Sequence, residues 1–279
     1  MIRFSLVVAT CGRTTEVKKL LASVLCQRRS DLEVVLVDQN ADDRLLPVIK
    51  EVQGRLTIRH LRTENRNVSA ARNLGLDAAQ GEIVAFPDDD CWYPDDLLDG
   101  VDRWFKTSPQ YSVLAVGAID DEGIPSGNRW IQSSCEITPW NSLRTTFCSS
   151  LFLSAVEESR RMRFDPMLAR GEETDFILRL LGTGLRGRFD RSRYVRHPRR
   201  DMMSGTVSRQ RAVSYGAGMG RLVRRHSLTA LWTALVAYDL VRAGFVVLRG
   251  RPSDAAFCFA HATGLFKGFV LPEGSYDRL

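Results

Sequence analysis

The first hundred residues alternate between short apolar runs and amphipathic segments. Runs 4–9, 34–37 and 83–86 are rich in β-branched residues and are bounded by polar residues or glycine, as expected for strands covered on both faces. Between them, residues 15–27 and 69–79 repeat their apolar side chains at helical spacing. Strands that alternate with helices predict an α/β fold with a mostly parallel, doubly wound sheet.

The middle of the chain is less regular. Residues 113–119 and 193–196 predict further strands, and the Gly-, Pro-, Ser- and Thr-rich stretch 120–150 predicts long loops with one or two short strands. Behind Gly171, an acidic turn opens a helix that has apolar residues on one side over 176–181.

From residue 207 onward the pattern is helical, with a basic stretch at 221–225 and an apolar one at 228–248. No repeat, low-complexity tract or proline-rich linker divides the chain. We therefore predict one α/β domain over residues 1–204 and a helical C-terminal extension over residues 205–279.

Charge is distributed unevenly along the chain, although the net value is only +6. Residues 1–159 hold 17 Lys/Arg and 23 Asp/Glu, whereas residues 160–279 hold 22 and 10, a net charge of +12. A basic half suits an anionic partner, either nucleic acid or a membrane surface. Nucleic-acid binding would call for aromatic residues interleaved with arginine, or a recognition helix, and neither is evident after residue 160. We therefore expect no nucleic-acid partner.

The six cysteines form no CxxC pair and no His-Cys cluster, so neither a zinc site nor a disulfide framework is expected. We interpret them as small buried hydrophobic residues in a reducing compartment. The first apolar run is too short for the core of a signal peptide. These patterns favour a cytoplasmic location.

Ligands bind at the carboxyl ends of the strands in such sheets, which directs attention to residues 10–13, 38–40 and 88–90. The last of these segments holds three consecutive carboxylates, which repel one another at the end of a buried strand unless a cation is near. Divalent ions such as Mg²⁺ or Mn²⁺ bind carboxylates together with the phosphate oxygens of a substrate. On this segment alone, an acidic turn that caps the helix opened by residues 93–96 is an equal alternative.

Several motifs occur in a fixed order along the chain: SLVVATCGR at 5–13, EVVLVDQN at 33–40, NRNVSAARNLG at 65–75, DDDCWYP at 88–94 and FDPMLARGEETDFILRL at 164–180. In this order they resemble the inverting glycosyltransferases of family 2, which have the so-called GT-A fold. The resemblance extends over residues 5–198. DDDCWYP is similar to the DxD signature of that family.

The resemblance implies metal-dependent, inverting transfer of a sugar from a nucleotide-diphosphate donor to an acceptor hydroxyl, in cell-surface polysaccharide or glycolipid synthesis. It implies a nucleotide-sugar half over about 1–110 and an acceptor half over about 111–204. The implied contacts to the donor are Thr10, Arg13, Asp38, Arg72, Asp88 and Asp89. The implied ligands of Mn²⁺ or Mg²⁺ are Asp88, Asp90 and His197. For Arg72 a surface ion pair is an alternative, as is a structural role for His197.

An acceptor hydroxyl needs a base that takes its proton, and the family has an acidic residue after Gly-Glu in that role. Here that position is Glu173, where aspartate is commoner. A glutamate in the first turn of a helix is kept ionised by the helix dipole, which favours service as a base. Glu172 and Asp175 are the alternatives, and helix capping without catalysis is a third.

Two departures from the family pattern keep a different function open. Asn67 stands where glycine is usual, although asparagine also adopts left-handed backbone angles. With Glu173 in place of aspartate, a sugar-nucleotide-binding module without activity is the alternative function. The stretch GAGMG at 216–220 lacks the spacing of a dinucleotide-binding motif and instead predicts a small-residue helix face for close packing.

The apolar stretch 228–248 is long enough to cross a bilayer, but Asp239 and Arg242 interrupt it, and a charge at mid-bilayer is costly. Arginines flank the stretch on both sides, as in helices that lie in the membrane interface. We therefore predict peripheral attachment to the inner face of the cell membrane, where a lipid-linked saccharide acceptor would be presented. The alternative is a helix packed against the catalytic domain or a second subunit, with Asp239 and Arg242 paired on its surface.

Overall fold

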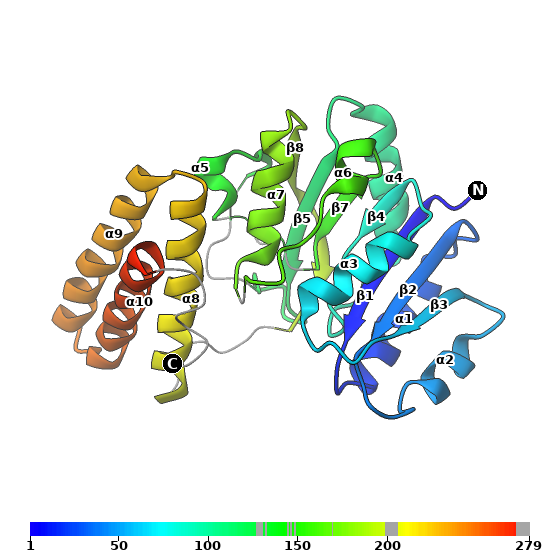
Figure 1. The fold of residues 1–279 in the computed structure, drawn as a ribbon, viewed down its shortest axis with the longest axis horizontal. Coiled ribbons are helices and arrows are strands. Elements are labelled where there is room, and N and C mark those ends of the chain that lie inside the picture. Colours follow the sequence, from blue (N-terminus) through cyan, green and yellow to red (C-terminus); the bar gives the residue numbers. More distant parts are fainter. Residues whose placement is uncertain are drawn as a thin grey trace. The chain divides into compact units, whose positions relative to one another are not determined.

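The computed structural model describes residues 1–126, 131, 133–143, 145, 147, 149–168, 170–198 and 206–271. The chain forms two compact units, one from Met1–Pro166 with Phe176–Arg199 and the other from Met167–Asp175 with Arg200–Leu279 (Figure 1). The short segment Met167–Asp175 therefore groups with the C-terminal helices. The boundary predicted between residues 204 and 205 lies outside the described residues.

The first unit is built on one mixed sheet, and its strands in the described residues run in the order β3-β2-β1-β4-β7-β5-β8-β6. The bounds are β1 Phe4–Thr10, β2 Leu32–Asp38, β3 Thr57–Arg62, β4 Ile83–Ala85, β5 Val113–Ile119, β6 Cys135–Glu136, β7 Leu151–Ser154 and β8 Gly187–Arg196. Neighbouring strands pair in parallel among β1–β4, whereas β7 runs antiparallel between β4 and β5, and β6 antiparallel to β8. The predicted mostly parallel α/β sheet is confirmed.

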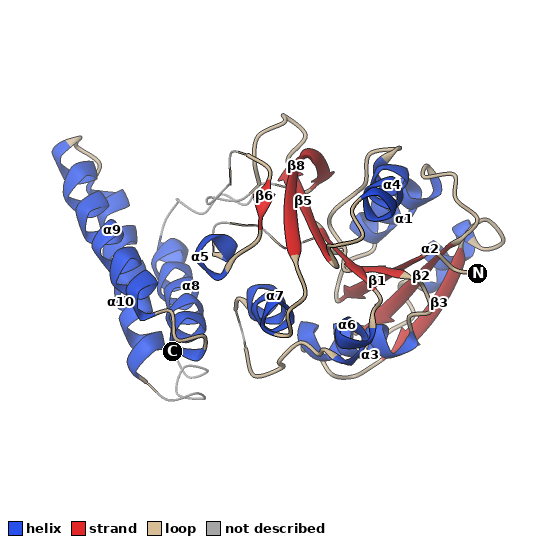
Figure 2. Ribbon diagram, turned by 90° about the horizontal axis from the view of Figure 1, so that it is seen from above, coloured by secondary structure: helices blue, strands red, loops and turns tan. Residues whose placement is uncertain are grey.

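Helices cover both faces of this sheet. Their bounds are α1 Thr15–Leu25, α2 Leu46–Val52, α3 Val68–Ala78, α4 Leu97–Thr107, α5 Pro139–Ser142, α6 Glu157–Arg161 and α7 Glu172–Gly182. Figure 2 shows α1 and α4 on one face and α3 and α6 on the other. Alternate residues of β1 serve the two faces, so that Leu6 and Val8 enter one apolar core and Val7 enters the other.

Several elements do not follow from the hydrophobic pattern. Strand β3 has the sequence TIRHLR and is only partly buried, because it forms the edge of the sheet. Strand β7 is four residues long, and nothing in its composition indicates that it reverses the direction of the sheet. The loop-rich stretch 120–150 does contain the short elements β6 and α5 among its described residues.

Two expectations about single residues are wrong. Asn67 has φ −89° and ψ 122°, not left-handed angles, and its side chain instead accepts a hydrogen bond from the Ala70 N–H at 3.0 Å as the N-cap of α3. Cys11 and Cys26 are exposed rather than buried, whereas Cys91 and Cys258 are buried as expected. Cys148 lies outside the described residues.

The second unit contains α8 Thr206–Arg225, α9 Thr229–Leu248 and α10 Pro252–Val270. Helices α8 and α10 meet backbone to backbone through two glycines four residues apart on each helix. A Cβ on Gly216 or Gly220 of α8 would lie 2.1 or 2.2 Å from a carbonyl oxygen of α10, and Gly264 and Gly268 of α10 are equally close to α8. The predicted small-residue packing face at 216–220 is present, and it lets the two helices approach closely.

Polar side chains join α9 to α10 inside the same unit. Asp239 accepts a hydrogen bond from Nδ1 of His261 at 2.5 Å, and both residues are buried. Trp232 donates from Nε1 to the carbonyl oxygen of Leu265 at 3.1 Å. Asp239 therefore faces the interior of the helical unit and does not form a surface pair with Arg242.

We expect Gly220→Ala to lower the free energy of unfolding by about 1–3 kcal/mol, because the added methyl group overlaps the α10 backbone. Gly244→Ala is the matched control, since Gly244 is an exposed glycine of α9 with open space around its Cβ position. This control is expected to gain up to about 1 kcal/mol from helix propensity. Thermal and denaturant unfolding of the two variants measure the difference, and equal effects would contradict the close packing.

Candidate functional site

The carboxyl ends of neighbouring parallel strands bring the predicted site residues to one edge of the sheet. Thr10, the last residue of β1, pairs in register with Asp38, the last residue of β2. Strand β4 runs parallel to β1 on its other side and is followed by the acidic turn that begins at Asp88. The site therefore results directly from the order of strands β2, β1 and β4.

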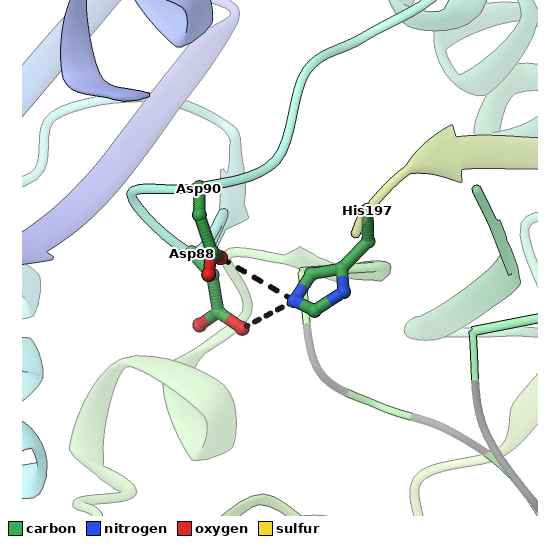
Figure 3. Close-up of side chains that lie close together, drawn as sticks. All are labelled: Asp88, Asp90 and His197. Carbon is green, nitrogen blue, oxygen red and sulfur yellow. Dashed lines mark ion pairs between the residues drawn. The ribbon is translucent and has the colours of Figure 1, made fainter. Parts of the chain in front are cut away.

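Asp88 and Asp90 converge on His197, which is more than a hundred residues away in the sequence (Figure 3). Nε2 of His197 lies 3.6 Å from Oδ2 of Asp88 and 3.3 Å from Oδ1 of Asp90. One ligand atom from each residue can be chosen so that all three lie within 4.8 Å of one another. This spacing suits three ligands of a single ion.

His197 is fixed by the backbone on both sides. Immediately before it, Arg196 exchanges two hydrogen bonds of 2.9 Å with Trp92, two residues after Asp90. The N–H of His197 donates to the carbonyl oxygen of Ile119 at 2.9 Å. Nδ1 lies 2.8 Å from the carbonyl oxygen of Pro198, which can only accept, so Nδ1 carries the proton and Nε2 faces the carboxylates.

The third carboxylate of the turn points to the β1 loop instead. Asp89 accepts a hydrogen bond from the Thr10 hydroxyl at 2.7 Å and is paired with Arg13. Nη1 of Arg13 also lies 2.9 Å from Oδ2 of Asp90, so this guanidinium bridges two of the three acids. In these contacts the turn faces the β1 loop and His197, and α4 begins at Leu97 with no side-chain cap, which does not support the helix-capping alternative.

The pKa values of the two acids are shifted in opposite directions. Burial raises the pKa of Asp89, and the Thr10 hydrogen bond and Arg13 only partly offset this effect. Burial acts in the same sense on Asp90, but when His197 carries a second proton on Nε2, its hydrogen bond to Asp90 and its charge, together with the charge of Arg13, outweigh burial and lower the pKa of Asp90. Asp90 is therefore the more readily ionised of the two.

Arg72 lies on α3 and is buried, and its Nη2 donates to Oδ1 of Asp88 at 2.9 Å. The backbone N–H of Asp88 donates to the hydroxyl of Ser149 at 3.1 Å. A surface ion pair is therefore the wrong interpretation of Arg72, because the residue fixes one of the two site carboxylates from inside the protein.

Asp38 is 1% exposed and is held by its neighbours. Oδ1 accepts from the backbone and side-chain N–H groups of Asn40 at 2.9 and 2.7 Å, and Oδ2 lies 3.0 Å from Nε2 of His60. Oδ1 of Asn40 in turn accepts from the N–H of Gly12 at 2.6 Å, which ties the loops after β1 and β2 together. Each carboxylate oxygen can accept two hydrogen bonds, so Oδ2 has capacity for one more donor beside His60.

The three acids of α7 lie in the other compact unit and differ among themselves. Asp175 is 0% exposed, and its Oδ1 lies 3.0 Å from Nε2 of His226 and 3.4 Å from Nε of Arg225. Glu172 and Glu173 are only partly buried in the first turn of the helix. The Asp175 carboxylate is already held by His226 and Arg225, whereas the two glutamates are partly exposed and can approach a substrate hydroxyl.

The structure thus brings together Thr10, Arg13, Arg72, Asp88, Asp89, Asp90 and His197, with Asp38 at the end of the neighbouring strand β2. The sequence analysis did not single out His60, Asn40 or Ser149 as contacts of these residues. His60 lies on the edge strand β3, which the hydrophobic pattern did not predict. Ser149 lies in a loop whose course no local signal defines.

The donor set fits a divalent metal ion. Two carboxylates and one imidazole nitrogen provide both negative charge and a neutral nitrogen ligand, and the proton on Nδ1 is already set by Pro198. Mn²⁺ accepts such a mixed set, whereas Mg²⁺ is more often bound by oxygen atoms alone. A fold with this site at the carboxyl ends of its strands is that of a GT-A glycosyltransferase.

Comparison with known proteins agrees with this class. The sequence profile of glycosyl transferase family 2 matches residues 5–165, more than half of the chain. The chain belongs to this family and is a glycosyltransferase.

Three curated relatives are named as glycosyltransferases or as a polysaccharide biosynthesis protein. The succinoglycan biosynthesis protein ExoM of Rhizobium meliloti is 25% identical over 260 residues, which cover 88% of this chain and 81% of that protein. An uncharacterised glycosyltransferase of Nostoc is 33% identical over 116 residues, 40% of this chain and 36% of the relative. The GalNAc(5)-diNAcBac-PP-undecaprenol β-1,3-glucosyltransferase of Campylobacter jejuni is 33% identical over 103 residues, 36% of this chain and 32% of that enzyme.

Solved structures share the fold. The mannosyltransferase PcManGT of Pyrobaculum calidifontis, solved with GDP-Man and Mn²⁺, aligns with a TM-score of 0.66 at 16% identity, covering 96% of this chain and 87% of that one. TarS of Staphylococcus aureus, residues 1–349, aligns with a TM-score of 0.62 at 17% identity, covering 95% and 91%. TarS has also been solved with UDP and with UDP-GlcNAc.

Proposed function

We propose that this glycosyltransferase is metal-dependent and inverting, and that it transfers a sugar from a nucleoside-diphosphate donor to an acceptor hydroxyl in polysaccharide or glycolipid synthesis. The observation that carries the proposal is the convergence of Asp88, Asp90 and His197 at the carboxyl ends of β1 and β4. The complexes of PcManGT with GDP-Man and Mn²⁺ and of TarS with UDP-GlcNAc support the choice of donor and ion.

Each residue of the first unit has a separate task in this proposal. Asp88, Asp90 and His197 hold Mn²⁺ or Mg²⁺, which when bound neutralises the diphosphate and makes it a better leaving group. Arg72 fixes the direction of Asp88, while Thr10, Arg13 and Asp89 set the shape of the loop beside the donor. Asp38 accepts a hydrogen bond from the nucleotide base through the remaining capacity of Oδ2.

Glu173 serves as the general base. Its carboxylate takes the proton of the acceptor hydroxyl as the acceptor oxygen bonds to the anomeric carbon, while the bond to the diphosphate breaks on the opposite face. Direct displacement of this kind inverts the anomeric configuration. The burial of Asp175 against His226 favours the two glutamates, and Glu172 is the second choice.

The acceptor is a lipid-linked saccharide presented at the inner face of the cell membrane, and the enzyme works from the cytoplasm. The Campylobacter relative, whose name specifies an undecaprenol-linked acceptor, supports this choice, as does the succinoglycan role in the name of ExoM.

We expect Asp90→Asn to weaken binding of the nucleoside diphosphate in the presence of Mn²⁺ by about tenfold or more, because one charged ligand of the ion is lost. A thermal-shift panel of nucleoside diphosphates with and without Mn²⁺ identifies the base first, since a ligand at ~100 times its Kd stabilises a protein by about 2.7 kcal/mol. Calorimetric titration then compares the variants. Asp95→Asn removes an exposed acid five residues further on and should bind like the wild type.

Equal nucleotide affinity of the wild type and Asp90→Asn, with chelator making no difference, would contradict metal dependence.

We expect Glu173→Gln to keep the affinity for the donor while lowering turnover by about 10²–10⁴, the range for removal of a general base. Glu158→Gln, an exposed glutamate on α6, is the control and should keep full turnover. The anomeric configuration of the product, read by NMR, tests direct displacement separately. If Glu172→Gln gives the large loss of turnover and Glu173→Gln does not, the base is Glu172. Turnover of any donor by the wild type rules out an inactive binding module.

A further inference from the structure

Helix α9 presents an uncharged face to solvent along its whole length. Every exposed residue of this helix, which is described in full, lacks a charge. The large exposed residues are Tyr238, Leu240, Val241, Phe245, Val247 and Leu248. With 20 residues the face extends about 30 Å. The large apolar residues of this face lie together within 238–248, and a contiguous exposed apolar surface marks an interaction site.

The charges that interrupt this helix in the sequence do not interrupt the face. Asp239 is turned towards α10, where His261 donates to it at 2.5 Å. Arg242 is partly buried and lies close enough to Cys258 of α10 to act electrostatically on its thiol. The exposed side of α9 is therefore left to apolar and small uncharged residues alone.

Cationic residues border the apolar face at both ends. Arg224 precedes α9 and Arg249 follows it, and beside them lie Arg225 and Arg251, each of which is paired with an aspartate. Arginines beside an apolar helix face match a surface that is apolar below and anionic above, namely a bilayer with acidic headgroups. A second copy of this chain would instead bring like charges together at the ends of the face.

Helix α9 passes the length and composition test for a membrane-spanning helix, with a mean hydropathy of 1.6 in its most apolar window, of which 17% is buried. However, α10 packs against both α8 and α9, and α8 exposes Arg209 and Arg211. Burying all sides of this unit in hydrocarbon would bury those arginines as well, at high cost. Only one side of the unit suits contact with lipid.

We propose that the exposed face of α9 lies in the surface of a membrane that contains anionic lipid. The helical unit thereby keeps the enzyme where a lipid-linked acceptor is presented. In this one respect the inference rests on the proposed function, whereas binding of the face to lipid does not depend on turnover.

Flotation of the full chain with phosphatidylcholine vesicles, with and without phosphatidylglycerol, tests the surface. We expect binding to the anionic vesicles that weakens with salt. The change Val241→Glu, at a residue that is 74% exposed, combined with Phe245→Glu, should lower the bound fraction about tenfold or more. Leu46→Glu makes the same change at a 47% exposed leucine of α2 and should leave binding intact.

If the chain turns over its donor but does not bind anionic vesicles, the proposal that α9 lies in a membrane surface is wrong. A dimer in solution that Val241→Glu dissociates, again without vesicle binding, would assign the face to a second copy. If the chain binds vesicles but does not turn over any donor, the membrane proposal is supported and the proposed function is contradicted.

A different set of contacts concerns Met167–Asp175, which carries Glu172 and Glu173 and belongs to the same compact unit as α8. Before the two glutamates, the Arg170 guanidinium lies 4.6 Å from the ring centroid of Tyr215. Gly171 has φ +82°, and a Cβ there would lie 2.5 Å from Leu222. Only glycine can combine that backbone angle with such close contact to α8.

After the two glutamates, Arg225 at the end of α8 and the following residue, His226, contact this segment again. Asp175 lies 3.0 Å from His226 and 3.4 Å from Arg225, and its carboxylate is fully buried. The α8 positions involved, from Tyr215 through Leu222 to Arg225, recur at three- to four-residue spacing when Gly218 against Arg170 is included. They therefore form one face of the helix, distinct from the glycines that meet α10.

We infer that α8, together with His226 directly after it, fixes the backbone on both sides of Glu172 and Glu173. His226 is then a positioning residue for the base. This second inference rests on the proposed role of Glu173. A general base must approach the hydroxyl within hydrogen-bond distance, so a small change in its direction costs turnover even when the donor still binds.

His226→Ala should lower kcat about 10- to 100-fold while the Kd for the nucleoside diphosphate stays unchanged. His226→Gln keeps a side-chain N–H that can donate to Asp175, and should restore much of kcat. The matched control is His261→Ala, which removes the other buried His–Asp pair of the unit, away from the glutamates. All variants are assayed with a water-soluble acceptor well below their unfolding temperature.

The control separates positioning from general stability. If His226→Ala and His261→Ala lower the unfolding temperature alike and both keep kcat, α8 and His226 have only a structural role. The inference that they position the base is then wrong. A loss of nucleotide affinity in His226→Ala would also overturn it. If Glu173→Gln itself keeps full turnover, the assignment of the base fails first, which distinguishes the two proposals.

Discussion

The repulsion among three consecutive carboxylates at the end of β4 is the constraint on which the site depends. Asp88, Asp89 and Asp90 are tolerated there because cationic or donor groups surround them, namely Arg72, the Thr10–Arg13 loop and His197. Each partner comes from another element, so the charges hold α3, the β1 loop and the end of β8 around one turn. Removing the three carboxylates would remove the ion pairs and hydrogen bonds that hold α3, the β1 loop and the end of β8 together.

Much of the structure of residues 1–110 could be predicted from the sequence, because its signals are local. Buried strands appear as β-branched runs, and the acidic turn follows one of them directly. Parallel pairing then places Thr10 beside Asp38 without further information. His197 could be suggested only by resemblance, since its approach to Asp90 depends on the pairing of Trp92 with Arg196.

Features that depend on distant packing could not be predicted in this way. The edge strand that carries His60 has no apolar run, and β7 reverses direction with only four residues. Helical spacing alone cannot tell Asp175 from Glu173, because both lie in the first turn of α7. Their difference arises from α8, whose contact with Asp175 is set by tertiary structure. Likewise, Asn67 serves as a helix cap and not as a substitute for a flexible glycine.

The passage of the chain from one compact unit to the other within α7, between Asp175 and Phe176, has a consequence for the construction of hybrid enzymes. A hybrid that replaces only the residues after the last strand would pair a foreign α8 with the native Met167–Asp175. The complementary surfaces of Gly171 and Leu222, or Asp175 and His226, would then come from different parents. Met167–Asp175 and the helices after the last strand therefore have to be exchanged together, because only then does a recombinant enzyme retain the contacts between them.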